Sequence, residues 1–392
     1  MDFTYLKNFM DFMAKEKTPG NAVEVYLGGE RVFSYASGYS SLEEKTPLTG
    51  DEYFNIYSCS KVATVTAGMQ VLEQGGFLIT DPLYDYIPEY KEMYIKDSNG
   101  SLKKAEKPIT VGDLFSMTAG LNYDVNSPSI KKARELTNGK METSVVARCL
   151  AEEPLSFEPG THWQYSLCHD VLAGLIEIVS GMKFRDYMKK NIFEPLGMDK
   201  TVYHATDKIK ARMSEQYRFV PNDFEGEFDA VKAQRSGNEK EGYFINIGKD
   251  VGYIFGEEYD SGGAGITTTT EDYAKFVAAL ANYGLGVNGE RILTKYSIDL
   301  MRINRLNEEA MKNFSWRQHI GYGYGLGVRT HINPNLSGGL SNLGEFGWGG
   351  AAGATVIVDP KINLGIFYTQ HCMNPREEFY QPRLRNVTYA GL

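Results

Sequence analysis

Hydrophobic and polar residues alternate along this chain with two distinct periods. Near the N-terminus, hydrophobic residues recur at the three- and four-residue spacing of one helix face: Phe3, Leu6, Phe9, Met10 and Met13. Acidic residues interrupt this stretch, and no small-residue cleavage site follows it. The pattern therefore predicts an amphipathic helix that packs on the fold, rather than a secretion signal.

Strand-like runs lie near both ends of the chain. Residues 23–35 contain two runs rich in β-branched and aromatic residues around a pair of glycines, which is typical of a β-hairpin. Residues 321–332, 354–360 and 364–370 also have the composition of strands.

Helical periodicity dominates between these runs and returns once after them. Thr110 stands where the N-cap of one such helix belongs. We expect helices over residues 62–73, 110–121, 171–181, 184–198 and 270–284. Residues 215–260 are polar and only weakly periodic, which predicts a long irregular surface excursion.

The order of these elements predicts a discontinuous architecture. Residues 1–60 and 260–392 would form an α/β sheet lobe. Residues 61–259, which include the excursion, would form a mainly helical lobe inserted into it. A length of 392 residues suits two lobes or one large domain.

Composition narrows the possible partners. With 42% hydrophobic and 23% charged residues, the chain is typical of a soluble globular protein. Its formal net charge of −9 argues against nucleic acid or an anionic membrane as the main partner. No apolar stretch approaches the roughly 18 residues needed to cross a bilayer. A small-molecule substrate is expected, and the oligomeric state is left open.

The spacing of the cysteines and histidines favours neither disulfide bonds nor a metal site. Four cysteines are widely scattered without a CxxC pair, which favours thiols in a reducing cytoplasm over disulfides. The six histidines show no HExxH or other ligand spacing, so neither a metal nor a cofactor is predicted.

Ser58 lies three residues before Lys61, where a strand-like run gives way to a helix. In a helix, both side chains share one face. A serine hydroxyl becomes a strong nucleophile when a base accepts its proton, and a lysine serves as that base once burial lowers its pKa. The pair is a candidate nucleophile and base. Taken alone, the pair is better explained by a serine that caps the helix and a solvated lysine, because the SxxK spacing is frequent by chance.

Two further stretches carry candidate chemistry. Tyr165 stands on a loop just before the helix predicted from residue 171, and a nearby lysine that lowered its pKa would suit it to proton transfer. Packing between lobes is the alternative role for this tyrosine. Gly349, Gly350 and Gly353 precede a β-branched run, which indicates a strand edge whose backbone lies close to a substrate, or a simple bulge.

Taken together, the order and spacing of these three stretches resemble the serine β-lactamase and penicillin-binding-protein superfamily, specifically its class C-like branch. The resemblance covers most of the chain. It implies a β-lactamase/transpeptidase-like fold, an α/β plus α architecture in which helices flank an antiparallel sheet. It also implies that Ser58 is acylated, that Lys61 is its base partner, and that Tyr165 relays the proton. The backbone N–H groups of Ser58 and Ala351 would form the oxyanion hole.

Two departures from the family pattern concern substrate binding. Leu167 stands two residues after the tyrosine, where β-lactamases and peptidases of the family have asparagine. Trp348, followed by Gly349 and Gly350, replaces the lysine or histidine that meets a substrate carboxylate. Both changes resemble the family VIII carboxylesterases, so we expect Trp348, Gly349, Gly350 and Leu167 to contact an ester or amide substrate.

The resulting hypothesis is a serine hydrolase that cleaves carboxylic esters through an acyl-enzyme. A β-lactamase or D-Ala-D-Ala-type peptidase is the alternative within the fold. A non-catalytic penicillin-recognising sensor is the alternative outside enzymes, and it would be expected to lack one of Ser58, Lys61 and Tyr165. A conventional α/β-hydrolase is disfavoured because no GxSxG pentapeptide occurs.

Overall fold

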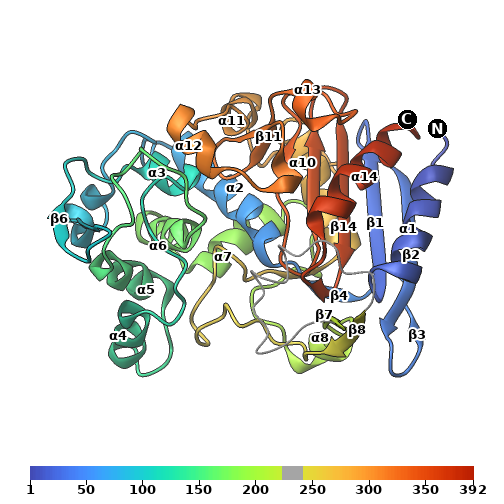
Figure 1. The fold of residues 1–392 in the computed structure, drawn as a ribbon, viewed down its shortest axis with the longest axis horizontal. Coiled ribbons are helices and arrows are strands. Elements are labelled where there is room, and N and C mark those ends of the chain that lie inside the picture. Colours follow the sequence, from blue (N-terminus) through green and yellow to red (C-terminus); the bar gives the residue numbers. More distant parts are fainter. Residues whose placement is uncertain (223–241) are drawn as a thin grey trace.

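The computed structural model describes residues 1–222 and 242–392, and its largest element is an antiparallel sheet. The strands of this sheet are β1 (Gly20–Leu27), β2 (Glu30–Ser41), β3 (Thr46–Pro47), β10 (Tyr322–Tyr324), β11 (Arg329–His331), β12 (Phe346–Gly347), β13 (Thr355–Asp359) and β14 (Leu364–Gln370). Their order across the sheet is β10-β11-β12-β13-β14-β1-β2-β3 (Figure 1). The predicted antiparallel sheet is therefore confirmed.

Both ends of the chain meet in this sheet. The predicted hairpin joins β1 to β2 through Gly28 and Gly29, whose φ angles of 62° and 86° lie in the left-handed region that glycine tolerates. On its other side, β1 pairs with β14, so that Val25 faces Ile366. The Asp2 N–H also donates to the Gly391 carbonyl at 2.9 Å.

Helices cover both faces of the sheet. α1 (Thr4–Glu16) and α14 (Glu377–Tyr389) pack on one face, and α10 (Thr270–Ala281) packs on the other (Figure 1). Along β13 the side chains alternate accordingly. Ile357 joins the cluster beneath α1, whereas its neighbours join the main core.

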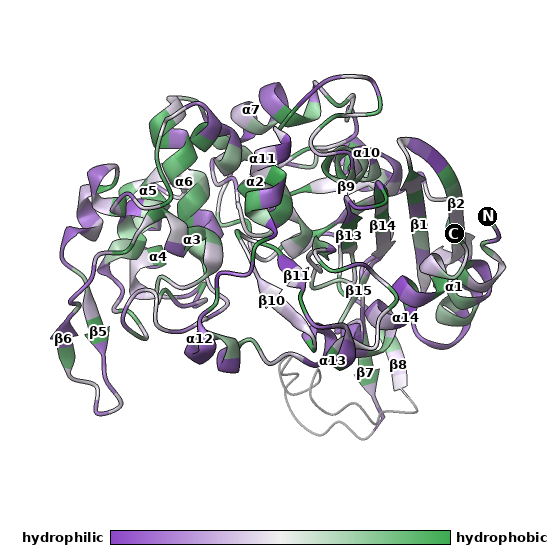
Figure 2. Ribbon diagram, turned by 90° about the horizontal axis from the view of Figure 1, so that it is seen from above, coloured by the Kyte–Doolittle hydropathy of each residue, from purple (hydrophilic) through white to green (hydrophobic). Residues whose placement is uncertain are grey.

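The rest of the molecule is mainly helical and surrounds one buried helix. Its principal helices are α2 (Ser60–Glu73), α3 (Val111–Ser116), α4 (Pro128–Leu136), α5 (Thr143–Cys149), α6 (Cys168–Ser180) and α7 (Phe184–Met188). α2 is buried along nearly its whole length. It packs so closely on its neighbours that a Cβ at Gly68 would lie 2.5 Å from the Phe115 ring. In Figure 2, α2 and α6 carry long stretches of hydrophobic residues.

Shorter elements complete the described part of the chain. They are β4 (Tyr53–Asn55), β5 (Tyr94–Lys96), β6 (Leu102–Lys104), β9 (Thr267–Thr269), α8 (Asp207–Ala211), α11 (Lys295–Met301), α12 (Glu308–Asn313) and α13 (Pro334–Ser337). β4 pairs with β9, which brings the segment before Ser58 beside the segment after Gly263. No helix in the two described ranges is long and apolar enough to cross a membrane.

Several predicted boundaries were wrong. Thr110 caps its helix as expected, but the helix ends at Ser116 because Met117 adopts a left-handed φ of 60°. α6 begins at Cys168 rather than at residue 171. The run 321–332 forms two strands rather than one.

The prediction of an irregular excursion at 215–260 was wrong for two short segments, whereas residues 247–260 contain no helix or strand. β7 (Tyr217–Pro221) pairs with β8 (Gly242–Asn246) on one side and with β15 (Cys372–Met373) on the other. Tyr217 is buried, whereas a residue of a polar surface excursion would be exposed. The centre of the excursion, residues 223–241, lies outside the described residues. The proposed division into two lobes stays a prediction.

Candidate active site

Ser58 lies in the tight turn Tyr57–Cys59, which joins β4 to α2. Tyr57 has a φ of 46°, a left-handed conformation that is costly for an aromatic residue. Burial of the Tyr57 ring and a 2.6 Å hydrogen bond from its hydroxyl to Gln216 Oε1 hold it there. This sharp turn leaves the Ser58 side chain half-exposed at the start of a buried helix.

Lys61 is fully buried beneath Ser58. Its Nζ donates a 2.8 Å hydrogen bond to the Gly263 carbonyl and lies 3.3 Å from Ser58 Oγ. Burial lowers the pKa of Lys61 to about 8, since a charged amine is costly away from water, while Asp170 acts in the opposite direction. A lysine in this state can accept a proton near neutral pH.

Asp170 anchors the loop that receives Lys61. Its Oδ1 accepts hydrogen bonds from Tyr259 Oη (2.8 Å), Ser261 Oγ (2.7 Å) and the Gly263 N–H (3.2 Å). A Cβ at Gly263 would lie 2.5 Å from Asp170 Oδ2 and 3.1 Å from Lys61 Nζ. The contacts between Asp170, Gly263 and Lys61 therefore leave no room for a larger residue.

Tyr165 completes the predicted trio. Lys61 Nζ lies 4.7 Å from the centre of its ring, and the Trp348 indole N–H donates to its hydroxyl at 3.3 Å. Burial raises the pKa of Tyr165 above its ordinary value, although hydrogen bonds from Ser58 and Trp348 oppose this shift. The phenol pKa is therefore raised rather than lowered, because burial makes the largest contribution to it.

The glycine-rich segment lies directly against the Ser58 turn. A Cβ at Gly350 would collide with the Ile56 carbonyl oxygen, so glycine allows the close approach. Among the hydrogen bonds between described residues, none is donated by the backbone N–H of Ser58 or of Ala351. Two such groups beside a serine hydroxyl are suited to a developing oxyanion.

Trp348 and Leu167 are both buried, since their side chains are only 2% and 3% exposed. Their contact with a substrate stays a prediction. Trp348 lies beneath Tyr165 and packs against its ring, with centroids 5.7 Å apart. Trp316 is instead the half-exposed ring beside Tyr165, at 5.3 Å.

Comparison with known proteins assigns this chain to a family. The family described as Beta-lactamase matches residues 7–390. The chain belongs to the Beta-lactamase family. The β-lactamase/transpeptidase-like fold and the serine hydrolase class, both predicted from the three motifs, are therefore confirmed.

Several relatives within the Beta-lactamase family carry esterase names. Esterase EstB of Burkholderia gladioli is 25% identical over 371 residues, which cover 91% of this chain and 87% of EstB. Lovastatin esterase of Penicillium rubens is 28% identical, covering 86% and 84% of the two chains. The solved structure of EstCE1, a hydrolase with promiscuous acyltransferase activity, superposes with a TM-score of 0.77 at 24% identity, covering 98% and 97%.

Sequence patterns missed several residues that surround this Beta-lactamase-family site. Tyr123 stacks on Tyr165 with centroids 5.4 Å apart, and its hydroxyl lies 3.4 Å from Lys61 Nζ. Tyr253 packs edge-on against Tyr123. Asp170 was missed although it lies in the same stretch as Tyr165. None of these residues belongs to a local motif, because each reaches the site through tertiary contacts.

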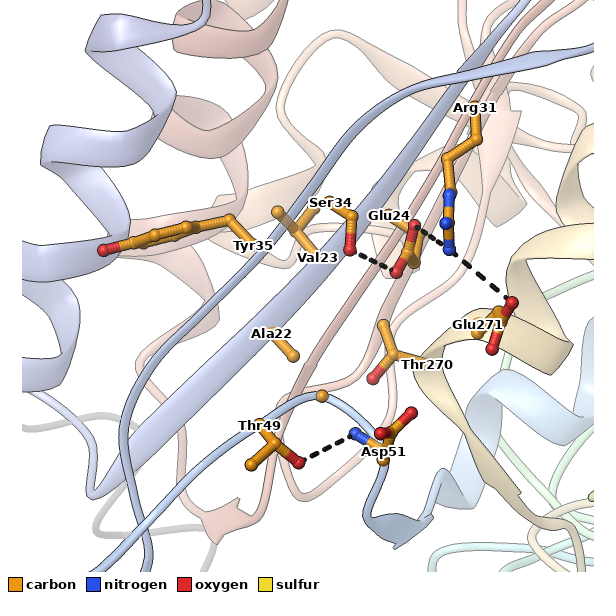
Figure 3. A pocket seen from close by; sticks show the side chains of 11 residues that line it. Ala22, Val23, Glu24, Arg31, Ser34, Tyr35, Thr49, Asp51, Thr270 and Glu271 are labelled. Carbon is orange, nitrogen blue, oxygen red and sulfur yellow. Dashed lines mark hydrogen bonds and ion pairs between the residues drawn. The ribbon is translucent and has the colours of Figure 1, made fainter.

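A separate hollow lies away from Ser58, at one side of the sheet. It has a volume of about 80 Å³ between β1, β2, residues 49–51 and the start of α10 (Figure 3). Arg31 lies within ion-pair distance of both Glu24 and Glu271, and Ser34 donates a hydrogen bond to Glu24. Arg31 thus lies between two carboxylates, and Asp51 adds a third acidic residue to the lining.

Proposed function

We propose that this enzyme cleaves carboxylic esters of small molecules through an acyl-enzyme on Ser58. The observation that carries this proposal is the buried Lys61 amine, whose pKa is lowered to about 8 and whose Nζ lies 3.3 Å from Ser58 Oγ. The esterase names of relatives that cover most of the chain support the same substrate class.

The first half-reaction forms the ester between enzyme and acyl group. Neutral Lys61 accepts the proton of Ser58 as Oγ attacks the substrate carbonyl. The backbone N–H groups of Ser58 and Ala351 bind the oxyanion of the tetrahedral intermediate. Tyr165 donates its proton to the leaving alkoxide, and the Lys61 ammonium then restores the phenol.

The second half-reaction releases the acid. Water takes the place of the alcohol and loses its proton to the same machinery as it attacks the acyl-enzyme. The tetrahedral intermediate collapses to a free carboxylic acid, and Ser58 regains its proton. An alcohol or amine in place of water would give acyl transfer by identical steps.

The test combines active-site labelling with turnover. A fluorophosphonate probe should add to Ser58, and nitrophenyl butyrate should be hydrolysed. Ser58→Ala should abolish both, and Tyr165→Phe should lower kcat at least about 100-fold, as expected for loss of a general acid. Label found on Ser60, or labelling that survives Ser58→Ala, would refute the assignment. Faster opening of a chromogenic cephalosporin than of the ester would favour the β-lactamase alternative.

A further inference from the structure

The C-terminal helix brings a carboxylate to the glycine-rich segment beside Ser58. Glu377 is the first residue of α14 and is half-buried. A Cβ at Gly349 would lie 2.8 Å from Glu377 Oε1 and 2.6 Å from Gln381 Nε2. Glycine at position 349 therefore lets this carboxylate approach the backbone of residues 349–351. This segment carries the Ala351 N–H of the proposed oxyanion hole.

Neutral amides, rather than cations, hold this carboxylate. Gln318 Nε2 donates to Glu377 Oε2 at 2.9 Å, and Gln381 Nε2 donates to Oε1 at 3.4 Å. Among the described residues, no lysine, arginine or histidine forms an ion pair with Glu377 within 4 Å. The charge on Glu377 is consequently left to act on whatever binds beside the segment 349–351.

The position of Glu377 matters because an anion would otherwise be favoured there. The first turn of a 13-residue helix presents unsatisfied N–H groups and a partial positive charge. Glu377 supplies the negative charge at this helix end itself. It also acts electrostatically on the site, since it contributes to the raised pKa of Tyr165 and of Cys59, the residue next to Ser58.

We propose that Glu377 sets the charge preference of the site, excluding substrates that carry a carboxylate close to the scissile bond and favouring neutral or amine-bearing esters. This inference rests on the proposed esterase function. It assigns the charge preference to Glu377, because Trp348 and Leu167 are uncharged and buried. It also gives a physical reason why the carboxylates of penicillins and D-Ala-D-Ala peptides would be disfavoured.

Because Glu377 ionises near neutral pH, the charge preference of the site should depend on pH. Burial raises the pKa of Glu377 to about 7, and Glu378 adds to this shift, while Gln318 and Arg329 oppose it. Glu378 belongs to the same helix, Gln318 to the turn that packs on it, and Arg329 to β11. The Tyr165 phenol is coupled to Glu377 as well, since the Glu377 charge contributes to its raised pKa. Discrimination against anions should therefore strengthen as pH rises from 6 to 8.

The test compares three phenyl butyrates that differ only in the 3-substituent of the leaving group: a carboxylate, its methyl ester and an aminomethyl group. In the wild-type enzyme, kcat/KM should be lowest for the carboxylate. Glu377→Gln should raise the carboxylate-to-methyl-ester ratio about tenfold at pH 8, as expected for removing a like charge nearby. The aminomethyl ester should lose its advantage. Because a ratio is used, titration of Lys61 cancels.

Glu378→Gln is the matched control, since it removes the same charge one residue away and keeps the contact to Gly349. It should change the ratio less than about twofold, the size of a screened surface effect. A ratio that is unchanged in Glu377→Gln, or a wild-type ratio that is independent of pH between 6 and 8, would overturn the proposal. A wild-type enzyme inactive on all three esters would overturn the esterase function instead. Dissociation constants of the three esters for Ser58→Ala, with and without Glu377→Gln, would then judge Glu377 separately.

Discussion

At the scale of single residues, Lys61 links burial to activity. Its pKa of about 8 means that about a tenth of the amines are neutral at pH 7. For a neutral ester, kcat/KM should therefore rise about tenfold per pH unit below pH 8 and level off above it. The measurement is a pH profile between 5.5 and 9.5. Lys61→Ala, as a control, should lose activity and this rise together, and a profile flat across pH 8 would contradict Lys61 as the base.

Asp170 provides a second residue-scale prediction. Its charge raises the pKa of Lys61, so Asp170→Asn should lower that pKa and move the acid limb of the profile by up to about one pH unit toward acid. The asparagine Oδ1 can still accept the three hydrogen bonds that hold the loop at residues 259–263. Asp272→Asn, which neutralises an equally buried carboxylate on α10, should leave the limb in place. A limb that moved toward alkaline pH would contradict this role.

At the scale of elements, the register between the Ser58 turn and the glycine-rich segment decides whether an oxyanion can be bound. Gly350→Ala would push its Cβ against the Ile56 carbonyl and displace the Ala351 N–H. Loss of one oxyanion-hole donor costs about 100-fold or more in kcat, with much less effect on KM. Gly339→Ala is the control, because a Cβ there meets its nearest atom at 3.6 Å. Equal kcat in the two variants would place the oxyanion hole elsewhere.

The same scale shows why some elements could be predicted and others could not. The helix that became α10 has a long amphipathic pattern, and the β1–β2 hairpin has its glycine turn. α2 is buried on nearly every side, so its length and the glycines that follow it carry the signal. α14 was not predicted, since it is largely polar and contains Pro382, which removes a backbone donor. The strand-like run before Ser58 became β4, but its partner β9 was not predicted, since three residues are too short for a periodic signal.

The candidate site divides in a similar way. Ser58 and Lys61 share one helical turn, so their spacing is visible in the sequence. Tyr123 and Glu377 approach the site from segments far away in the chain, and no spacing rule connects them. Exposure could not be predicted either. Trp348 lies beneath Tyr165, while Trp316 is the half-exposed ring, because packing of whole elements decides which of two aromatic residues is covered.

At the scale of the whole molecule, a buried ionic cluster joins the C-terminal helix to the sheet. Glu345 Oε1 accepts from Arg329 of β11 at 2.9 Å, and its Oε2 lies 3.1 Å from Arg385 Nε of α14. Tyr322 donates to the same carboxylate at 2.8 Å. All of these charged groups are buried, so each depends on the others for compensation.

Glu345→Gln should therefore destabilise the whole fold. Two buried guanidinium groups would lose their counter-charge, which costs about 3–5 kcal/mol when one partner of a buried pair is removed. The measurement is the urea midpoint at pH 7. Glu92→Gln, which removes an exposed pair with Lys104, should leave the midpoint where it is.

The pH dependence of this loss follows from the sign of the shift. Burial raises the pKa of Glu345, but the two arginines and Tyr322 outweigh it and hold this pKa below its usual value. The carboxylate therefore stabilises the fold at pH values above its pKa in the unfolded chain. This contribution disappears as pH falls through the lower pKa of the folded state. The difference between wild type and Glu345→Gln should thus be full at pH 7 and shrink below about pH 4. A difference that persisted undiminished at pH 3 would mean that shape, rather than charge, makes Glu345 necessary.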